Sequence, residues 1–425
     1  MNVERKTNQP HDEVQRLKRA IEELSVLNDL ARAISVVQDQ DEIMRTISKR
    51  SIKAIRAEQV SITLVDREAM VPTGTLVREV GSDVSEIYHL NRHLLGCMCH
   101  ERRALLVNDP DNDERLKGIP IDAGVRNFIC VPLMVGAELI GVLSAYNKIG
   151  DEGFDPDDQR LLAIIASQSA QVLERARIQI ENRANVDNLR AAEKIQMGLL
   201  PQEQPDIAGY DVAGDTLAAG HVGGDYYDFI PLKDKRWAIA LGDVSGKGLP
   251  AALLMATLQA TLRSLALQGT SCHQSTTDCN HLLYLSTTPD KFATLFYSRL
   301  DTRSNVLTYC NAGHERPLYL TSSGRTKRLT SGGLAAGVLE HFDYEDDIVI
   351  LQPGETVVIF SDGVTDMENT AEEPFGEDRL VELVEANRDC TATELVRRII
   401  NQVRDHAGGA ERFDDVTVVV IKRNP

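Results

Sequence analysis

The sequence predicts a mixed α/β protein with two domains joined by a long helix. Its 425 residues are enough for two hydrophobic cores. From Asp157 to about Leu200, apolar residues recur three or four apart, which indicates a helix. On either side, short apolar runs such as Gln59–Val65 and Thr356–Phe360 have strand character. The expected parts are a charged N-terminal helix (1–23), a first domain (24–173), a helical linker or coiled coil (174–204) and a second domain (205–425).

The first domain is expected to begin with helices and to continue as a sheet. Residues 24–34 and 41–57 have helical spacing, and Gln59–Val65 alternates as a strand does. Residues 89–124 contain several Pro, Gly and Asn, so we expect loops there. Two apolar runs, 127–134 and 138–146, flank a short Gly-containing turn and predict a hairpin.

The helix over about 157–200 carries a narrow apolar stripe, with charged residues on its other faces. Its apolar positions include Ile165, Leu173, Ile180, Val186 and Ile195. A single helix cannot bury such a stripe, but a parallel copy from a second chain can cover it. We therefore expect a homodimer formed through this segment. A solvated spacer helix is the alternative, because the heptad pattern is imperfect.

Five aspartates of the second domain stand at the ends of strand-like runs: Asp225, Asp243, Asp362, Asp414 and Asp415. Carboxylates brought together without counter-charge are costly to bury. A divalent cation removes that cost, and all-oxygen ligation favours Mg²⁺ or Mn²⁺ over Zn²⁺. Two such ions about 3.5–4 Å apart can activate water for in-line displacement at phosphorus. The pattern therefore predicts hydrolysis of a phosphate ester.

Five motifs in the second domain carry a family resemblance. They are GGDYYDF (223–229), GDVSGKGLPAALLM (242–255), NAGHERPLYL (311–320), SDGVTDMEN (361–369) and FDDVTVVV (413–420). In this order they resemble the SpoIIE-like branch of the PPM metal-dependent serine/threonine phosphatases, from about Pro205 to the C-terminus. The resemblance implies an αββα sandwich with two Mn²⁺ or Mg²⁺ ions at one end of the sheets. It also implies a phosphorylated protein substrate, which in bacterial members is often an anti-anti-sigma (STAS) protein.

The resemblance also implies roles for individual residues. Asp243 bridges both ions, and the backbone carbonyl of Val244 and the Asp225 carboxylate serve one of them. Asp362 and Asp414 serve the other. Asp415 remains an alternative for that last position, because sequence does not separate adjacent aspartates.

Three further residues have open roles. Asn311 and His314 either orient water or a metal ligand, or they stabilise a tight turn. Ser245 stands where many PPM enzymes of other branches have a candidate acid histidine. The leaving-group proton would then come from water at the metal site or from His314.

The first domain is similar to a GAF domain over residues 24–173. The phrases that carry this resemblance are ALLVND (104–109), FICVPL (128–133) and ELIGVL (138–143). GAF domains bind small ligands or dimerise, so the resemblance leaves the input signal open. A signature of cyclic-nucleotide-binding members is partly present at Asn147, Lys148, Phe154 and Asp158, but Gln159 replaces its last acidic residue. These positions also suit the start of the long helix.

Charge and composition exclude several functions. The net charge of −18 argues against binding to nucleic acid or to anionic lipid. We expect no membrane segment, because no apolar run approaches the roughly 20 residues required. The polar N-terminus is unlike a signal peptide, and seven scattered cysteines fit reduced thiols. The expected location is the cytoplasm.

Together these features predict a signal-regulated serine/threonine protein phosphatase. The GAF domain, which is a possible site for a small-molecule ligand, would control it through the helical linker. One alternative is a catalytically silent scaffold that binds a phosphoprotein, although all the proposed ligands are present. A nucleotide-hydrolysing domain is less consistent, because the sequence lacks a P-loop and a dinucleotide-binding glycine motif.

Overall fold

The computed structural model describes residues 40–66, 72–79, 88–410 and 414–425. Contacts divide the chain into two compact units, Met1–Ala184 and Asn185–Pro425, each described here by itself. The expected charged helix of residues 1–23 and the expected helical segment 24–34 lie outside the described residues.

The first unit is built on a five-stranded antiparallel sheet with the order β2-β1-β5-β4-β3. Its strands are β1 (Ala57–Val65), β2 (Pro72–Glu79), β3 (Leu105–Val107), β4 (Phe128–Val135) and β5 (Glu138–Lys148). The predicted strand and the predicted hairpin are therefore confirmed. At the hairpin turn Gly136 has a φ of 61°, a left-handed conformation that glycine adopts at no steric cost.

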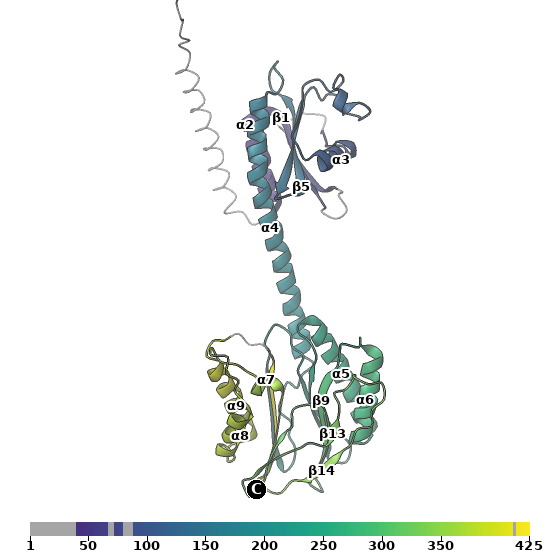
Figure 1. The fold of residues 1–425 in the computed structure, drawn as a ribbon, viewed down its shortest axis with the longest axis vertical. Helices are drawn as coiled ribbons and strands as arrows, with labels where there is room; N and C mark the ends of the chain where they lie inside the picture. The colour runs from purple at the N-terminus through teal and green to yellow at the C-terminus, as the bar shows by residue number, and fades with distance from the viewer. Residues whose placement is uncertain (1–39, 67–71, 80–87, 411–413) are drawn as a thin grey trace, which may run out of the picture. The chain divides into compact units, whose positions relative to one another are not determined.

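Helices cover both faces of this sheet (Figure 1). Helix α2 (Gln40–Ile55) and the first part of α4 (Pro156–Met197) pack on one face, where Ile47 and Ile165 meet Ile62. Helix α3 (Arg92–Glu101) packs on the other, together with a 3₁₀ turn, η1 (Glu114–Leu116).

Helix α3 corrects the expectation of loops across residues 89–124. The helix starts at a regular cap, because the Asn91 side chain accepts a hydrogen bond from the Leu94 amide at 2.8 Å. It buries Leu94, Leu95 and Met98 against the sheet. Pro110, Gly118 and Pro120, which suggested loops, all lie beyond its end, so their signal was extended too far towards the N-terminus.

The residues of the partial cyclic-nucleotide signature serve the fold of the first unit. The Asn147 side chain donates to the Gly124 carbonyl at 3.0 Å. Lys148 forms an ion pair with Asp158 at the start of α4, and Phe154 is buried. These contacts tie the end of β5 to the helix that follows.

Helix α4 has 42 residues, close to the predicted span of 157–200. Its early apolar positions, including Ile165, Leu173 and Ala176, are buried against the sheet of their own unit. That part of the stripe is therefore not available to a second chain. Farther along, Ile180 and Ile195 remain exposed, at 45% and 70%. A coiled coil through this later part remains a prediction.

The second unit contains two sheets. Their orders are β13-β10-β9-β8-β7, with β14 beside β10, and β12-β11-β15-β16-β6. The strands are β6 (Tyr210–Leu217), β7 (Tyr226–Pro231), β8 (Arg236–Val244), β9 (Ala293–Asp301), β10 (Val306–Ala312), β11 (Leu318–Leu320), β12 (Thr326–Arg328), β13 (Gly332–Gly333), β14 (Asp347–Ile350), β15 (Thr356–Phe360) and β16 (Val416–Arg423). Helices α5 (Leu249–Gln268) and α6 (Cys272–Ser286) lie outside the first sheet, and α8 (Glu377–Ala386) and α9 (Ala392–Ala407) outside the second (Figure 1). This is the predicted αββα sandwich.

Alternation along the strands explains the layers. In β15, Val357 and Ile359 face the core between the two sheets, whereas Val358 and Phe360 face the core beneath α9. The period of two places consecutive side chains on opposite faces. Helix α9 has a core-facing apolar stripe with helical spacing, and all five of its residues are buried: Leu395, Val396, Ile399, Ile400 and Val403.

Helix α5 corrects the expectation that no segment is apolar enough for a membrane. Among the described residues it is the one helix that meets that test, with 20 residues and a mean hydropathy of 1.2. Half of it is buried inside the protein. Leu254, Met255, Leu258 and Leu262 pack in the same core as β7 and β8. Its apolar composition is thus that of a core helix.

Candidate metal centre

The predicted aspartates stand at strand ends belonging to both sheets. Asp225 directly precedes β7, and Asp243 is the penultimate residue of β8 in the same sheet. In the other sheet, Asp362 follows β15 at the start of a short helix, α7 (Asp362–Thr365), while Asp414 and Asp415 directly precede β16. Strand ends are rigid positions, so they aim side chains with little freedom.

The electrostatic environment shows that these carboxyl groups are close together. Burial raises the pKa of Asp243 to about 7, and the charges of Asp362, Asp414 and Asp415 raise it in the same direction. Burial also raises the pKa of Asp225 well above its ordinary value, with Asp243 and Asp415 adding to the effect. The pKa of Asp362 is raised by burial first and by Asp414 second. Carboxylates from two sheets thus repel one another at one edge of the sandwich.

Glycines allow the acidic turns to approach so closely. A Cβ atom on Gly224 would lie 2.8 Å from the Val244 carbonyl oxygen and 3.2 Å from Asp243 Oδ1. A Cβ on Gly363 would lie 2.0 Å from the Asp415 carbonyl oxygen. Any larger residue would push the turns apart. The Val244 carbonyl therefore lies against the turn that carries Asp225, as the predicted ligand set requires.

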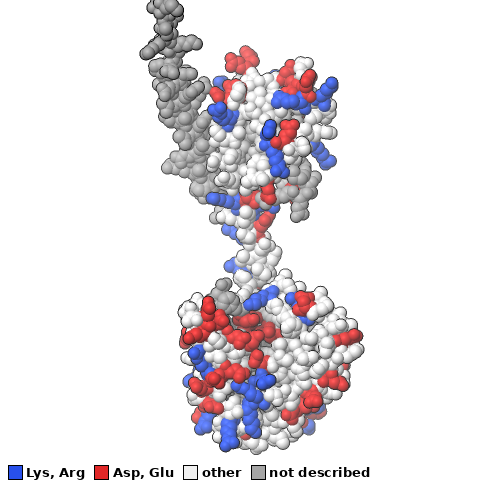
Figure 2. Space-filling view, in the orientation of Figure 1, with Lys and Arg blue, Asp and Glu red and all other residues white. Residues whose placement is uncertain are grey.

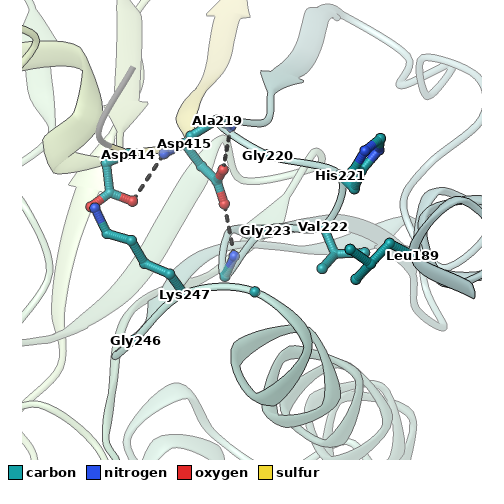
Figure 3. A pocket seen from close by; sticks show the side chains of 12 residues that line it. Leu189, Ala219, Gly220, His221, Val222, Gly223, Gly246, Lys247, Asp414 and Asp415 are labelled. Carbon is teal, nitrogen blue, oxygen red and sulfur yellow. Dashed lines mark hydrogen bonds between the residues drawn. The ribbon is translucent and has the colours of Figure 1, made fainter. Parts of the chain in front are cut away.

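The two adjacent aspartates, Asp414 and Asp415, differ in their hydrogen bonds. The Asp415 carboxylate accepts hydrogen bonds from three backbone amides, those of Ala219 (2.8 Å), Gly224 (2.7 Å) and Asp225 (3.3 Å). The Asp414 carboxylate accepts one, from the Asp415 amide at 2.9 Å. Figure 3 shows the Asp415 side chain directed at the glycine loop, and Lys247 extending towards Asp414. Asp415 thus holds three backbone amides, whereas Asp414 holds one.

Two hydroxyl residues that the sequence analysis missed support the carboxylates. Thr417 donates its hydroxyl to Asp225 Oδ2. The Ser361 hydroxyl donates to the Asp415 carbonyl at 3.1 Å and accepts from the Thr417 amide at 3.0 Å. Both residues lie inside the quoted SDG and DDVT motifs, which was the available signal. They link Asp225 of one sheet to the acidic turns of the other.

The residues present fit hard divalent cations. All candidate ligands are oxygens, and Asp362 Oδ1 is buried with no hydrogen-bond partner among the described residues. Among the described residues, one group places three potential metal-ligand atoms within 4.8 Å of one another. It lies elsewhere, at His281, Glu340 and His341. The aspartates are spaced more widely than that. Three of these carboxylates would therefore have to draw closer together to hold one ion.

Asn311 and His314 form a buried turn behind this edge. The Asn311 side chain accepts from the His314 amide at 2.7 Å and donates to the His314 carbonyl at 3.0 Å. His314 Nδ1 contacts the Thr294 hydroxyl at 2.8 Å. Burial lowers the pKa of His314 to about 3, and the Phe360 backbone acts in the opposite direction. The ring is therefore neutral at pH 7 and is a poor proton donor.

Ser245, the other residue with an open role, closes a loop. Its amide donates to the Phe292 carbonyl at 2.9 Å, and its hydroxyl accepts from the Phe292 amide at 3.0 Å. This pairing fixes the turn after Asp243. Ser245 therefore has a structural role at the position where other PPM branches have a candidate acid histidine.

A pocket of about 390 Å³ opens beside the carboxylates. Its lining includes Leu189 of α4, the glycine loop 219–224, Lys247, Asp414 and Asp415 (Figure 3). Figure 2 shows acidic side chains gathered over the same end of the domain, where α7 lies. The pocket can therefore admit a small group directly to the acidic edge.

Comparison with known families agrees with both halves of the chain. Residues 37–174 match the GAF domain, and residues 233–424 match the stage II sporulation protein E (SpoIIE) family. A solved structure, the SiaA-PP2C domain of Pseudomonas aeruginosa, shares the fold with a TM-score of 0.51 at 19% identity, covering 57% of this chain and 98% of that domain.

Two curated relatives are similar in sequence. Protein IcfG of Synechocystis sp. is 32% identical over 273 residues, which cover 58% of this chain and 43% of that protein. Phosphoserine phosphatase RsbU of Bacillus subtilis is 32% identical over 238 residues, covering 55% of this chain and 70% of that protein. The chain thus spans less than half of IcfG and over two thirds of RsbU.

Fold and site together define a PP2C-type phosphatase domain that follows a GAF domain. The chain belongs to the SpoIIE family of phosphatases, together with RsbU. Phosphatases of this family depend on Mn²⁺ or Mg²⁺, in agreement with the oxygen-only set of candidate ligands.

Proposed function

We propose that the chain is a signal-regulated protein serine/threonine phosphatase. It hydrolyses phosphoserine or phosphothreonine on a partner regulatory protein. The observation that carries this proposal is the meeting of buried carboxylates from both sheets, whose pKa values are raised by one another and by burial. Such a cluster is unfavourable without cations, and two hard cations in this position are suited to phosphate hydrolysis.

The proposed ligand set is supported by the contacts described above. Asp243 would serve both ions, and Asp225 and the Val244 carbonyl would serve one of them. Asp362 and Asp414 would serve the other ion, and Asp414 is preferred to Asp415 because the Asp415 carboxylate accepts from three amides. When bound, the two ions supply an activated water and neutralise charge that develops on the phosphoryl group. Thr417 keeps the Asp225 carboxylate oriented for this role.

The substrate enters through the pocket beside Asp414. Lys247 is in its lining and provides positive charge for an incoming phosphate. The leaving-group proton comes from water, since His314 is held neutral by burial and the Ser245 hydroxyl accepts from Phe292. A buried neutral imidazole is a poor acid at physiological pH.

The partner and the control of the enzyme are also part of the proposal. RsbU is described as a phosphoserine phosphatase, which supports a phosphoserine substrate for this chain. The substrate that we propose is a phosphorylated STAS-type anti-anti-sigma factor. The GAF domain senses a small molecule and acts through α4, whose exposed Ile180 and Ile195 pair in a homodimer. The proposed place of action is the cytoplasm.

A catalytically silent phosphoprotein scaffold is the alternative. The test is turnover by the full chain of p-nitrophenyl phosphate and of a serine-phosphorylated STAS protein, with and without Mn²⁺. We expect Mn²⁺-dependent release of phosphate that EDTA abolishes. Binding of the phosphoprotein without turnover in Mn²⁺ would favour the scaffold and reject the enzyme.

A further inference from the structure

A second group of potential metal ligands lies where helix α6 meets the loop between β13 and β14. His281 of α6 and two residues of the loop, Glu340 and His341, each place one potential ligand atom within 4.8 Å of the others. The two imidazole rings are stacked, with centroids 5.2 Å apart and an angle of 17° between their planes. His341 Nε2 lies 3.6 Å from Glu340 Oε1. This group shares no residue with the carboxylate cluster, so it is a separate candidate site.

The backbone beneath this group is held by Asn280, which is 1% exposed. Its Nδ2 donates to the Leu339 carbonyl at 2.9 Å, and its Oδ1 accepts from the Gly337 amide at 2.8 Å. The Tyr344 hydroxyl also donates to this Oδ1, at 3.4 Å. Asn280 directly precedes His281, so a buried residue fixes the loop against the helix beside the candidate ligands.

A backbone contact also sets the tautomer of one imidazole. His281 Nδ1 lies 3.3 Å from the Glu340 carbonyl oxygen. A carbonyl oxygen can only accept, so Nδ1 of the neutral ring carries the proton and Nε2 carries the lone pair. Histidines that bind metals commonly donate their other ring N–H to a backbone carbonyl in this way. The His281 ring is therefore prepared to bind a metal through Nε2.

The local charge favours a cation over an anion. Residues 340–347 include five acidic side chains and no Lys or Arg, and the Glu340 carboxylate is itself a potential ligand. The donor types decide which cation. Imidazole nitrogen suits transition ions such as Zn²⁺, whereas Mg²⁺ and Ca²⁺ prefer sites made only of oxygens.

We propose that His281, Glu340 and His341 bind a Zn²⁺ ion that joins α6 to the loop between β13 and β14. Two His and one Glu are an established Zn²⁺ ligand set, which leaves a fourth position open to solvent. Tetrahedral ligands about 2.0–2.1 Å from the ion lie roughly 3.4 Å apart, so the ligand atoms must move closer together. The side chains of His341 and Glu340 are 80% and 50% exposed and can rotate to do so. This ion is additional to those at the aspartates, and its binding does not depend on the proposed phosphatase activity.

The test measures Zn²⁺ binding to the full chain in the presence of excess Mg²⁺. Mg²⁺ fills the oxygen-only site at the aspartates and competes poorly for imidazole. Equilibrium dialysis followed by elemental analysis gives the Zn²⁺ bound per chain at each free concentration. His341→Ala and Glu340→Gln each remove one ligand at an exposed position, where folding is not at risk. The matched controls are His89→Ala and Glu345→Gln, which change an exposed histidine of the GAF domain and an exposed acid of the same loop.

We expect His341→Ala and Glu340→Gln to bind the first Zn²⁺ ion at least about tenfold more weakly than wild type. Groups that only orient metal ligands already change affinity by about 10–100-fold when removed. The two controls should bind Zn²⁺ as wild type does. Zn²⁺ should also slow amide hydrogen exchange over residues 337–344 in wild type and in the controls, but not in His341→Ala, because the ion ties the loop to α6.

Wild-type Zn²⁺ affinity in both His341→Ala and Glu340→Gln would overturn the proposal. The bound ion would then lie elsewhere, for example at the partly exposed thiols of Cys97 and Cys99. An equal loss of affinity in the controls, or no Zn²⁺ bound by wild type in Mg²⁺, would also overturn it. Failure of the proposed function has a different signature, since it removes Mn²⁺-dependent phosphate release and leaves Zn²⁺ binding at His281 unchanged.

Discussion

The two domains each place polar residues where a strand ends, and the two sets differ in charge balance. In the GAF domain, Lys148 at the end of β5 pairs with Asp158, so each charge has its opposite. In the phosphatase domain, Asp243 near the end of β8 meets further aspartates, and its pKa rises to about 7. A balanced pair holds the fold without further groups. An unbalanced cluster lacks counter-charge, which a divalent cation would supply.

This comparison also explains why similar sequence signals have different uses. The stretch around Lys148 and Asp158 and the stretch around Asp243 look alike in the sequence. Each is short, contains Asp and lies next to a glycine or asparagine turn. Sequence alone treats them alike. The contacts show that one set is satisfied within the chain, while in the other Asp362 Oδ1 is buried without a partner among the described residues.

The largest effect is expected from Asp243→Asn. Removing the central carboxylate should lower turnover by at least about 10³-fold, the scale for a group that stabilises the transition state. Metal-free Asp243→Asn should also melt at a higher temperature than metal-free wild type, because one unbalanced buried charge is gone. Turnover and calorimetric melting are the measurements. The control is Asp234→Asn, in an exposed turn with a φ of 59° that asparagine tolerates; turnover of Asp243→Asn within tenfold of this control would contradict the assignment.

A smaller loss is expected from Thr417→Val. This change removes the hydroxyl that donates to Asp225 and should weaken Mn²⁺ binding about tenfold. Thr216→Val is the matched control, because the Thr216 hydroxyl contacts Thr417 at 2.7 Å and is not bonded to Asp225. Calorimetric titration measures both. Equal affinity in the two variants would remove Thr417 from the metal centre.

His314 predicts a pH dependence of stability. Its folded-state pKa is lowered from 6.5 to about 3, so below about pH 6.5 the unfolded chain binds a proton that the folded chain does not. The free energy of unfolding should therefore fall as the pH decreases from about 6.5 towards 3. Urea unfolding of metal-free wild type and His314→Asn between pH 7.5 and 5 tests this. The variant should show a shallower slope, and parallel slopes would be the contrary result.

The smallest effect on activity is expected from a change in the ion pair between Lys148 and Asp158 of the GAF domain. Lys148→Met leaves the Asp158 carboxylate without its partner and should lower the stability of the GAF domain by about 1–2 kcal/mol. Basal turnover should stay within twofold of wild type, because Lys148 is remote from the phosphatase motifs in sequence and packs within the first unit. Thermal unfolding and a phosphate-release assay measure the two quantities. A large drop in basal turnover would show that the pair does more than hold the fold.

Sequence predicted well the features that depend on local periodicity. The hairpin of β4 and β5, the stripe of α9 and the long helix α4 all agree with their apolar spacing. Helix α3 was missed because a loop signal later in the segment was extended over it. The membrane expectation overlooked α5, because a helix buried in a large core has the composition of a spanning segment.

The site was predictable to the level of its motifs. Motif order pointed to the aspartates at strand ends, but the choice between Asp414 and Asp415 depends on amides almost 200 residues away in sequence. Ser361 and Thr417 look like ordinary turn and strand residues until the two sheets are brought together.

Anomalous diffraction from crystals of the full chain grown with Mn²⁺ tests the central claim most directly. The account predicts two peaks about 3.5–4 Å apart, both beside Asp243, one towards Asp225 and the Val244 carbonyl and the other towards Asp362 and Asp414. Contrary evidence would be the absence of density at these carboxylates while Mn²⁺ occupies another group, such as His281, Glu340 and His341.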